Sequence, residues 1–392
     1  MEEQAAQAAK KLKKRRRSTG RGKIVIAVIL TLLLSTGLWC LALGPSGIAM
    51  VQTYLLARFA FVEADADLDS AVDAGLGAFV SGLGDRWSYY LSAESYAATT
   101  ERRANSYVGV GVTVDSVSRE EGLLVLSVTG DGPADKAGMR TGDVITAVDG
   151  ASIAGDARKD GSGMIAGEAG TQVVLTLLGE DGAVRDVTCT RATLYNPAAR
   201  GAMLEDNVGY VRLSNFYSGS ADSFRSEVDS LVAQGARCLV VDVRSDPGGY
   251  VAELQKILDY LLPEGPVFTH KPRWWLKSVY QSDADCVDLP MAVLVDKDTY
   301  SAAELLAAQL RETAGAPIVG ELTSGKGYSQ VTFPLANGGG AGLSTATYCT
   351  GSGHSLIGEG ITPDVELSLP KGAALGGEDD VQLQAAIGLL GK

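Results

Sequence analysis

The stretch MAVLVDKDTYSAAELLAAQLRETAGAPIVG, residues 291–320, decides the fold of this chain. Its first five residues are apolar and predict a buried strand, and the alanine- and leucine-rich run from Ser301 to Glu312 predicts a helix. Residues 318–320 predict a second strand directly after that helix. Strands that alternate with helices indicate an α/β domain.

The same alternation extends toward the N-terminus. Residues 208–213 and 239–243 are apolar runs that predict strands, and residues 221–234 between them predict a helix. We therefore predict an α/β core over residues 194–370, followed by a C-terminal tail with a short helix over residues 371–392.

Residues 106–193 have a different pattern, in which short strand-like runs are separated by turns. Residues 108–114 and 123–128 predict strands, and the turn-rich residues 132–139 come before further strand-like runs. This stretch is predicted to be a mainly β domain. Residues 44–105 before it have helical spacing and are predicted to form a helical lead-in.

The N-terminus joins a basic segment to an apolar one. Residues 1–23 contain nine Lys or Arg and two Glu, whereas the whole chain has a net charge of −13. Residues 24–43 carry no charge, and about 20 apolar residues suffice to span a bilayer as a helix. Because basic residues flank the inner side of a span, we predict a single-pass membrane protein with residues 1–23 as a cytoplasmic tail. A cleaved signal peptide is the competing interpretation, although its apolar region is usually shorter.

This topology places the rest of the chain outside the cytoplasm, with membrane lipid contacted through residues 24–43. Nucleic-acid binding is not expected, because the exported part is acidic and the basic run beside the span serves membrane topology. The five cysteines show no C-x-x-C spacing. We therefore predict no metal site and no cofactor.

Ser301 and Lys326 are the candidate nucleophile and base. A serine hydroxyl needs a neighbouring base, and the chain has only two histidines, so lysine is the available substitute. To act near pH 7, Lys326 needs a pKa lowered by about 3 units through burial or positive potential. Two plainer interpretations stay open. Ser301 with Glu304 matches a helix capping box, and Lys326 in its glycine-flanked run matches a surface lysine.

Three further residues complete the predicted site. Gln330 could orient the lysine amine through its side-chain carbonyl group, and a strand-edge glutamine is the alternative. The N–H groups of Gly249, after a predicted strand, and Ala302, at a predicted helix start, could form an oxyanion hole. A plain turn is the alternative for Gly249. Asp242 and Arg244 are predicted to form a structural ion pair rather than to act in catalysis.

One segment of the β domain is similar to a known family. The signature of PDZ domains in exported bacterial proteases resembles the runs Gly132-Pro133-Ala134, Ala137-Gly138-Met139, Gly142-Asp143 and Val148-Asp149-Gly150. In such domains a loop of backbone N–H groups holds the terminal carboxylate of a peptide, which adds as a strand to the sheet. The resemblance implies that this loop consists of Val108, Gly109, Val110, Gly111 and Val112. A small β-rich spacer is the alternative.

A second resemblance covers most of the chain from Asp85 to Val365. The C-terminal processing peptidases, or tail-specific proteases, are similar to this chain in five runs, at residues 209–216, 242–249, 301–304, 325–330 and 360–364. The resemblance implies a catalytic dyad of Ser301 and Lys326, assistance from Gln330, a PDZ domain that gates the substrate, and a core similar to the crotonase and Clp protease fold.

The chain departs from that family pattern at two places. Thr299-Tyr300 stands where a small Ser-Ala is usual, and residues 350–353, Thr-Gly-Ser-Gly, stand where Thr-Pro-Ser-Gly is common. Neither change removes a reacting group. The departures therefore bear on substrate preference rather than on activity.

We predict from these observations a membrane-anchored serine endopeptidase, with its catalytic part outside the cytoplasm, that cleaves proteins whose exposed C-terminal tails its PDZ domain captures. A homo-oligomer is left open. One alternative is a non-catalytic membrane-tethered PDZ scaffold, against which the intact set of Ser301, Lys326 and Gln330 argues. Another is a crotonase-class enzyme acting on acyl thioesters, which an exported protein would rarely meet.

Overall fold

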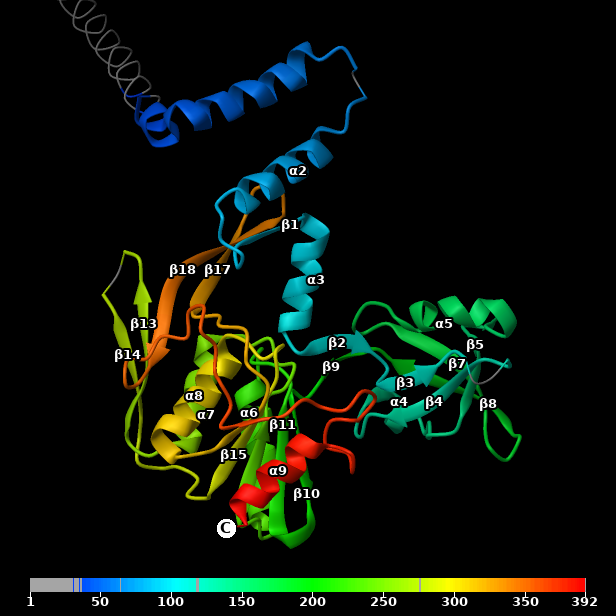
Figure 1. Cartoon of the computed structure of the whole chain (residues 1–392). Coiled ribbons are helices and arrows are strands. Elements are labelled where there is room, and N and C mark those ends of the chain that lie inside the picture. The colour runs from blue at the N-terminus through cyan, green and yellow to red at the C-terminus, as the bar shows by residue number, and fades with distance from the viewer. Residues whose placement is uncertain are drawn as a thin grey trace, which may run out of the picture. The chain divides into compact units, whose positions relative to one another are not determined.

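The computed structural model describes residues 31, 35, 37–63, 65–117, 120–274 and 276–391 (Figure 1). The chain divides into two compact units, Met1–Ala78 and Phe79–Lys392. The predicted cytoplasmic tail and most of the predicted span lie outside the described residues.

One long helix, Gly37–Ala60, dominates the described part of the first unit. Its described part, from Gly37, overlaps the predicted span and continues beyond residue 43, where the prediction ended. Among the described residues it is the one helix long and apolar enough to cross a membrane. Gly44 interrupts its regular geometry with a φ of 61°, a value that glycine adopts readily. The predicted apolar N-terminal helix is therefore present, with a later end.

The predicted helical lead-in contains a short strand that its sequence pattern did not indicate. Helix α2 (Leu68–Ser81) and helix α3 (Ala93–Arg103) agree with the prediction, but β1 (Tyr89–Leu91) lies between them. Ser92 caps α3 by accepting a hydrogen bond from the N–H of Ser95. Three residues are too few to show a strand period, and β1 exists because it pairs with a distant strand.

The mainly β domain is a sheet in the order β3-β4-β5-β7-β8, with β6 paired to β5. Its strands are β3 (Val112–Asp115), β4 (Leu123–Val128), β5 (Val144–Val148), β6 (Ala151–Ser152), β7 (Gln172–Leu178) and β8 (Val184–Thr190). Its helices are α4 (Pro133–Lys136), the 3-10 turn η1 (Gly155–Ala157) and α5 (Arg158–Ile165). A two-stranded ribbon of β2 (Ser106–Gly109) and β9 (Ala192–Tyr195) leads the chain in and out. The domain has its own hydrophobic core, which includes Leu123, Met139, Ile145, Val173 and Leu175.

The central sheet of the α/β core has the strand order β10-β11-β12-β15-β16-β19. Its strands are β10 (Ala199–Met203), β11 (Val208–Leu213), β12 (Cys238–Asp242), β15 (Met291–Val295), β16 (Ile318–Gly320) and β19 (Val365–Glu366). Only β10 is antiparallel to its neighbour, β11. The 3-10 turn η2 (Glu205–Asn207) joins these two strands.

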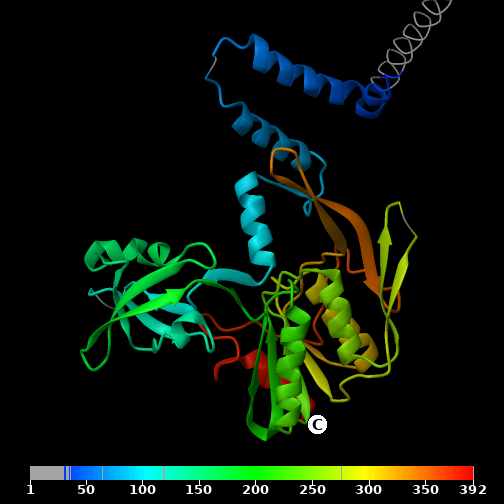
Figure 2. The same cartoon turned by 180° about the vertical axis from the view of Figure 1, so that it is seen from behind.

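Helices cover both faces of this sheet, as Figures 1 and 2 show from opposite sides. Side chains from alternate strand positions enter two separate hydrophobic clusters. One cluster packs against α6 (Ser220–Ala233), α7 (Val251–Leu261) and α8 (Ala302–Ala314), and the other against α9 (Val381–Leu390). Strands buried on both faces explain the continuous apolar runs in the sequence.

Helix α8 is the most deeply buried helix of the core. Every residue from Ala302 to Leu310 is buried, and Gly315 ends the helix with a φ of 64°. Alanine at four of those positions lets the helix pack closely on its neighbours. Replacing the fully buried Leu306 by alanine is expected to cost about 2–5 kcal/mol, because the helix has no free side to relax toward.

A second sheet packs beside the core and was not indicated by the sequence. Its order is β1-β18-β13-β14, with β17 also paired to β18. The strands are β13 (Gly265–Pro272), β14 (Ser278–Ser282), β17 (Tyr328–Pro334) and β18 (Gly340–Thr350). Because β17 begins two residues after Lys326, this sheet fixes one end of the lysine loop.

Candidate active site

The five predicted catalytic and oxyanion residues lie along one cleft of about 640 Å³. Ser301 and Ala302 come from the start of α8, and Gly249 comes from the loop after β12. Lys326 comes from the loop before β17, and Gln330 belongs to β17 itself. Tyrosines form much of the remaining wall, at positions 89, 96, 217, 250, 280, 300 and 348.

Ser301 lies in a strained turn between β15 and α8. Its φ of 64° and ψ of −121° are unusual for any residue other than glycine. Such a conformation costs on the order of 1–3 kcal/mol and persists only where neighbouring contacts impose it. Here the carboxylate of Glu304 accepts the N–H of Ser301 at 2.9 Å, which is one half of the predicted capping box. Ser301 lines the cleft at the start of α8.

Lys326 has the perturbed acidity that a lysine base needs. Burial lowers its pKa to about 8, and the positive charge of Arg103 acts in the same direction, while Glu304 and Asp85 oppose the shift. Its ammonium nitrogen lies 5.1 Å from the centre of the Trp87 ring. At a pKa of about 8, roughly a tenth of the amine is neutral at pH 7.

Glu304 ties the serine turn to the lysine loop. This carboxylate is fully buried, at 0% exposure, and receives donors from both segments. The donors are the N–H of Ser301, the hydroxyls of Thr323 and Ser324, and the N–H groups of Gly325 and Lys326. The sequence analysis assigned Glu304 only to a helix cap. Its reach to residues about 20 positions later depends on the packing of the lysine loop on α8.

The loop around Gly249 is held by backbone hydrogen bonds on both sides of this residue. The carbonyl of Gly248 accepts the N–H of Phe216 at 3.0 Å, and the carbonyl of Phe216 accepts the N–H of Tyr250 at 2.7 Å. These bonds flank Gly249, whose own N–H has no hydrogen-bond partner among the described residues. The same is true of the N–H of Ala302. Two free N–H groups therefore line the cleft near Ser301.

Asp246 fixes this loop against the serine turn. Its carbonyl accepts the N–H of Tyr300 at 3.1 Å, and its Oδ1 accepts the N–H of Gly248 at 2.7 Å. A Cβ atom added to Gly248 would lie 2.9 Å from the nitrogen of Ala302, so the loop and the turn pack backbone to backbone. Complete burial raises the pKa of Asp246 well above its ordinary value.

Gln330 uses its amide nitrogen to bond within its own sheet. Nε2 donates to the carbonyl of Tyr328 at 3.2 Å and to the hydroxyl of Ser344 at 3.0 Å. This arrangement leaves the side-chain carbonyl oxygen of Gln330 as the group available to Lys326 in the shared cleft.

Tyr348 lines the cleft together with Ser301, and the sequence analysis missed it. This tyrosine belongs to β18, and its hydroxyl donates a hydrogen bond to the backbone carbonyl of Lys326. Burial raises the pKa of Tyr348, so it stays protonated. In the described part of the chain, no hydrogen bond joins the Ser301 hydroxyl to the Lys326 amine. Catalytic hydrogen bonds often tighten only when substrate binds, so this bond is expected to form in the complex with substrate.

Asp242 and Arg244 belong to a buried network that does not line the cleft, and they form the predicted ion pair. Arg244 bonds Asp242 at 2.6 Å and also Asp380 at 2.6 Å, and all three side chains are buried. Gln382 accepts a further bond from Arg244 at 2.8 Å. Asp380 and Gln382 belong to the C-terminal segment, which thereby closes one end of the core.

The edge strand β3 lies at the place where the PDZ resemblance puts the bound peptide. Val108 and Gly109 belong to β2 and pair with β9, whereas Val110 and Gly111 form the turn that leads to β3 at Val112. Gly111 has a φ of 85°, which a side chain would disfavour. Strand β3 has β4 on one side and no strand partner on the other among the described residues.

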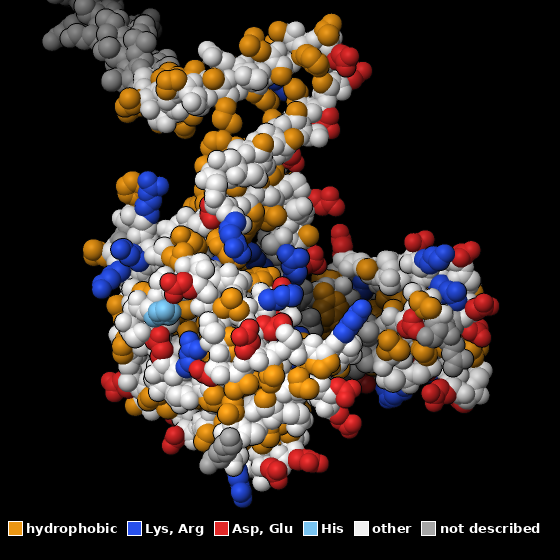
Figure 3. Space-filling model, viewed as in Figure 1, with side chains coloured by type: hydrophobic (Ala, Val, Ile, Leu, Met, Phe, Trp, Pro, Cys, Tyr) orange, Lys and Arg blue, Asp and Glu red, His pale blue; other side chains and the backbone are white. Residues whose placement is uncertain are grey.

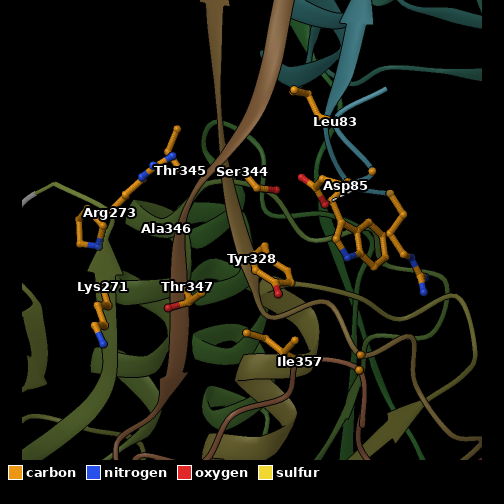
Figure 4. A pocket seen from close by; sticks show the side chains of 16 residues that line it. Leu83, Asp85, Lys271, Arg273, Tyr328, Ser344, Thr345, Ala346, Thr347 and Ile357 are labelled. Carbon is orange, nitrogen blue, oxygen red and sulfur yellow. Dashed lines mark hydrogen bonds between the residues drawn. The ribbon is translucent and has the colours of Figure 1, made fainter. Parts of the chain in front are cut away.

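A second cavity, of about 810 Å³, is lined in part by Gly325 of the lysine loop (Figure 4). Lys271 and Arg273 lie on one side of it and Asp85 on the other, with Tyr328 between them. Gly325 and Trp87 also line this cavity. Both are neighbours of Lys326, one in sequence and one through its ring. In the described part of the chain, no cluster of His, Cys, Asp or Glu could hold a metal ion.

Comparison with known proteins gives two family matches. The profile of Peptidase family S41 matches residues 207–367, and that of the PDZ domain matches residues 107–189. The described features of both stretches fit these matches: an α/β core with the serine at a helix start, and a mainly β domain with a free edge strand.

Individual relatives give the same result. A carboxyl-terminal-processing protease of Picosynechococcus is 32% identical over 329 residues, which are 82% of this chain and 79% of that protein. The chloroplastic C-terminal processing peptidase of Tetradesmus obliquus is 33% identical over 304 residues, which are 73% of this chain. The chain spans 65% of that algal protein, just under two thirds of its length. A structure of a putative S41 protease from Bacteroides fragilis superposes with a TM-score of 0.51 at 18% identity, covering 80% of this chain and 90% of the other.

Proposed function

Because the chain belongs to peptidase family S41, the family of carboxy-terminal processing proteases, we propose that it is a serine endopeptidase using Ser301 and Lys326. The observation that carries this proposal is the meeting of the two side chains in one cleft, with the pKa of Lys326 lowered to about 8. Burial of a lysine ammonium group is unfavourable, and binding a peptide alone does not require it.

In the proposed reaction, neutral Lys326 takes the proton of the Ser301 hydroxyl, and Oγ attacks the carbonyl carbon of the scissile bond. The N–H groups of Gly249 and Ala302 hold the negative oxygen that forms. Lys326 then gives its proton to the leaving amine, which breaks the C–N bond and leaves an acyl group on Ser301. Water, deprotonated by Lys326, releases that acyl group. Gln330 orients the amine through its free carbonyl oxygen.

The β domain, over residues 106–193, is proposed to bind the C-terminal tail of the substrate along β3. The support for this step is the free edge of β3 and the turn at Val110 and Gly111, which brings backbone N–H groups to the start of that strand. Glycine at 109 and 111 keeps the turn open to a peptide backbone.

We further propose that the N-terminal apolar segment anchors the protein in a membrane, with the protease core outside the cytoplasm. Support comes from the length and apolar composition of the Gly37–Ala60 helix and from the basic residues that precede it in the sequence. Substrates would then be proteins of the cell envelope with exposed C-terminal tails.

Digestion of an unstructured test protein with an apolar C-terminal tail tests the proposal. The whole chain in detergent is expected to cut it, and Ser301→Ala and Lys326→Ala are each expected to lower kcat at least about 10²-fold while tail binding persists. Replacing the last residues of the substrate by aspartates should raise KM more than it changes kcat, because only capture is altered. Full activity of Ser301→Ala would refute the proposal, and tail binding without cleavage by the unaltered chain would favour the scaffold alternative.

A further inference from the structure

The β13–β14 hairpin ends in an exposed cluster of basic and apolar side chains. We call Lys271, Arg273, Trp274, Leu276 and Lys277 the hairpin tip. Trp274 is 79% exposed and Leu276 is 92% exposed, which is far more than apolar side chains of this size usually are. An exposed aromatic and an exposed leucine on one short turn need a physical reason.

The hairpin that carries the tip is well ordered at its base. Phe268 and Tyr280 stack across the two strands with ring centres 4.2 Å apart and planes 15° apart. Strand β13 pairs with β18 along residues 268–272, so the hairpin is attached to the second sheet. The hydroxyl of Ser282 donates to the carbonyl of Pro263 at 2.5 Å. The apolar side chains of the tip are therefore held in water by a structured support.

The tip is a local exception to the charge of the protein. Residues 265–282 contain three cations, Lys271, Arg273 and Lys277, and no Asp or Glu, whereas the chain as a whole has a net charge of −13. The guanidinium of Arg273 lies 4.8 Å from the centre of the Trp274 ring, so cation and aromatic ring occupy the same place. In Figure 3 the blue and orange side chains gather together at this end of the hairpin.

This combination of side chains matches the interface of an anionic bilayer. Trp is enriched where the acyl chains meet the headgroups, and long basic side chains beside it reach the phosphate layer. Each Lys or Arg near an anionic surface adds attraction, which the acidic remainder of the protein lacks. A protein partner is the weaker fit, because stable protein interfaces need about 20–30 residues a side and the tip offers five.

We propose that the hairpin tip is a membrane contact separate from the N-terminal helix, with Trp274 and Leu276 entering the headgroup region of an anionic bilayer. Phe268, His270 and Tyr280 of the same hairpin line the candidate catalytic cleft. Contact at the tip therefore holds the mouth of the cleft near the lipid surface. The proposal does not depend on peptidase activity.

Vesicle binding by residues 79–392 tests this contact without the N-terminal helix. This part is a compact unit that contains all three hydrophobic clusters, so it closes its cores by itself. It is expected to float with vesicles of equal phosphatidylcholine and phosphatidylglycerol, and much less with phosphatidylcholine alone. The double change Trp274→Ser and Leu276→Ser should lower the partition coefficient at least about tenfold. Changing Lys271, Arg273 and Lys277 to Gln should lower it about fivefold per charge and remove the lipid preference.

Matched controls separate the tip from general stickiness. Val117→Ser removes an apolar side chain that is 81% exposed on the β domain, and it should leave vesicle binding unchanged. Equal thermal unfolding midpoints would show that every variant is folded. The proposal is overturned if the unaltered protein does not bind anionic vesicles, or if the tip variants bind as well as the control. It is also overturned if the tip variants change only the sedimentation of the protein without lipid, since the tip would then contact a second copy.

The intact chain in bilayer nanodiscs provides a second measurement. Amide hydrogen exchange over residues 271–280 is expected to slow when phosphatidylglycerol is in the disc, and to return to the rate in detergent when the tip cations are changed to Gln. Exchange that is the same with and without anionic lipid would contradict the proposal.

Discussion

The serine turn and the lysine loop are prepared for chemistry in different ways. Ser301 is placed by backbone conformation, with a φ of 64° imposed by the contacts of its turn. At Lys326 the unusual feature is the side chain, whose pKa burial and the positive charge of Arg103 lower to about 8. The positive φ in this loop, 74°, belongs to the neighbouring Gly325. Glu304 accepts backbone N–H groups from both segments.

This difference teaches that position and reactivity have separate structural sources. A nucleophile with an ordinary hydroxyl needs accurate placement, which a strained turn supplies. A lysine base needs a pKa lower than its ordinary value, and burial among neighbouring side chains lowers it. Changes that touch only one source should therefore have separable effects on stability and on rate.

The largest effect is expected for Lys326→Met, which keeps the length of the side chain and removes the base. Peptidase kcat should fall about 10²–10⁴-fold. Stability at pH 7 should rise, because a buried ammonium is disfavoured there, and we expect the unfolding midpoint to increase by about 2–4 °C. Calorimetry and peptide digestion on the same preparation would check both. A variant that is both less active and less stable would contradict the separation.

Glu304→Gln is expected to weaken both segments at once. An amide in place of the carboxylate presents N–H groups to backbone N–H donors, so at least one buried donor loses its partner. We expect the free energy of unfolding to fall by about 2–4 kcal/mol, and activity to fall as well. The effects of Glu304→Gln and of a change at Ser301 or Lys326 should be smaller in the double variant than the sum of the two single effects. Chemical denaturation of single and double variants measures the coupling. Additive effects would show that Glu304 does not join the two segments.

Ser301→Gly and Ser301→Ala should differ in stability although neither can react. Glycine adopts a φ of 64° without strain, whereas alanine keeps the strain of serine. Ser301→Gly is therefore expected to be more stable than Ser301→Ala by about 1 kcal/mol or more, measured by urea unfolding. Equal stability would mean that the turn is not strained in solution.

The smallest effect is expected for Arg103→Gln, which acts on the base through space. Loss of this positive charge should move the midpoint of the pH–rate profile to higher pH, because Arg103 favours the neutral amine of Lys326. Arg102→Gln is the matched control, since Arg102 is exposed on the same helix and does not line the cleft. An unchanged midpoint in Arg103→Gln, or the same change in both variants, would contradict the assigned cause.

The pH dependence of the unaltered protein follows from the same shift. The amine of Lys326 must be neutral to act, so the rate should rise with pH through about 8 and then level off. The unfolded chain keeps its proton up to the ordinary value of 10.5, so the folded state gains stability as pH rises from about 8 toward 10.5.

Buried strands of both the α/β core and the β domain were predicted from the sequence, whereas the second sheet was not predicted. Residues 291–295 and 123–128 are strands as predicted, because continuous or alternating apolar runs report burial directly. Strand β18 is rich in Gly, Ser and Thr and shows no such run, although it contributes Tyr348 to the site. Its pairing with β1, β13 and β17 depends on residues far apart in the sequence.

The candidate site was predictable in its reacting groups but not in their surroundings. Ser301 and Lys326 stand in short runs with recognisable chemistry. Arg103 lines the cleft and Trp87 contacts the amine of Lys326, and both positions depend on the pairing of β1 with β18, a tertiary effect without a local signal. The role of Glu304 was half visible, since a capping box indicates the bond to Ser301 and says nothing of the lysine loop.

The most direct test of the central claim is the rate at which a fluorophosphonate labels Ser301 as a function of pH, with the modified residue identified by peptide mass spectrometry. We predict a single label on Ser301, a rate that rises with a midpoint near pH 8, and loss of that labelling in Lys326→Met. Labelling of another residue, or a rate in Lys326→Met equal to that of the unaltered protein, would contradict the account.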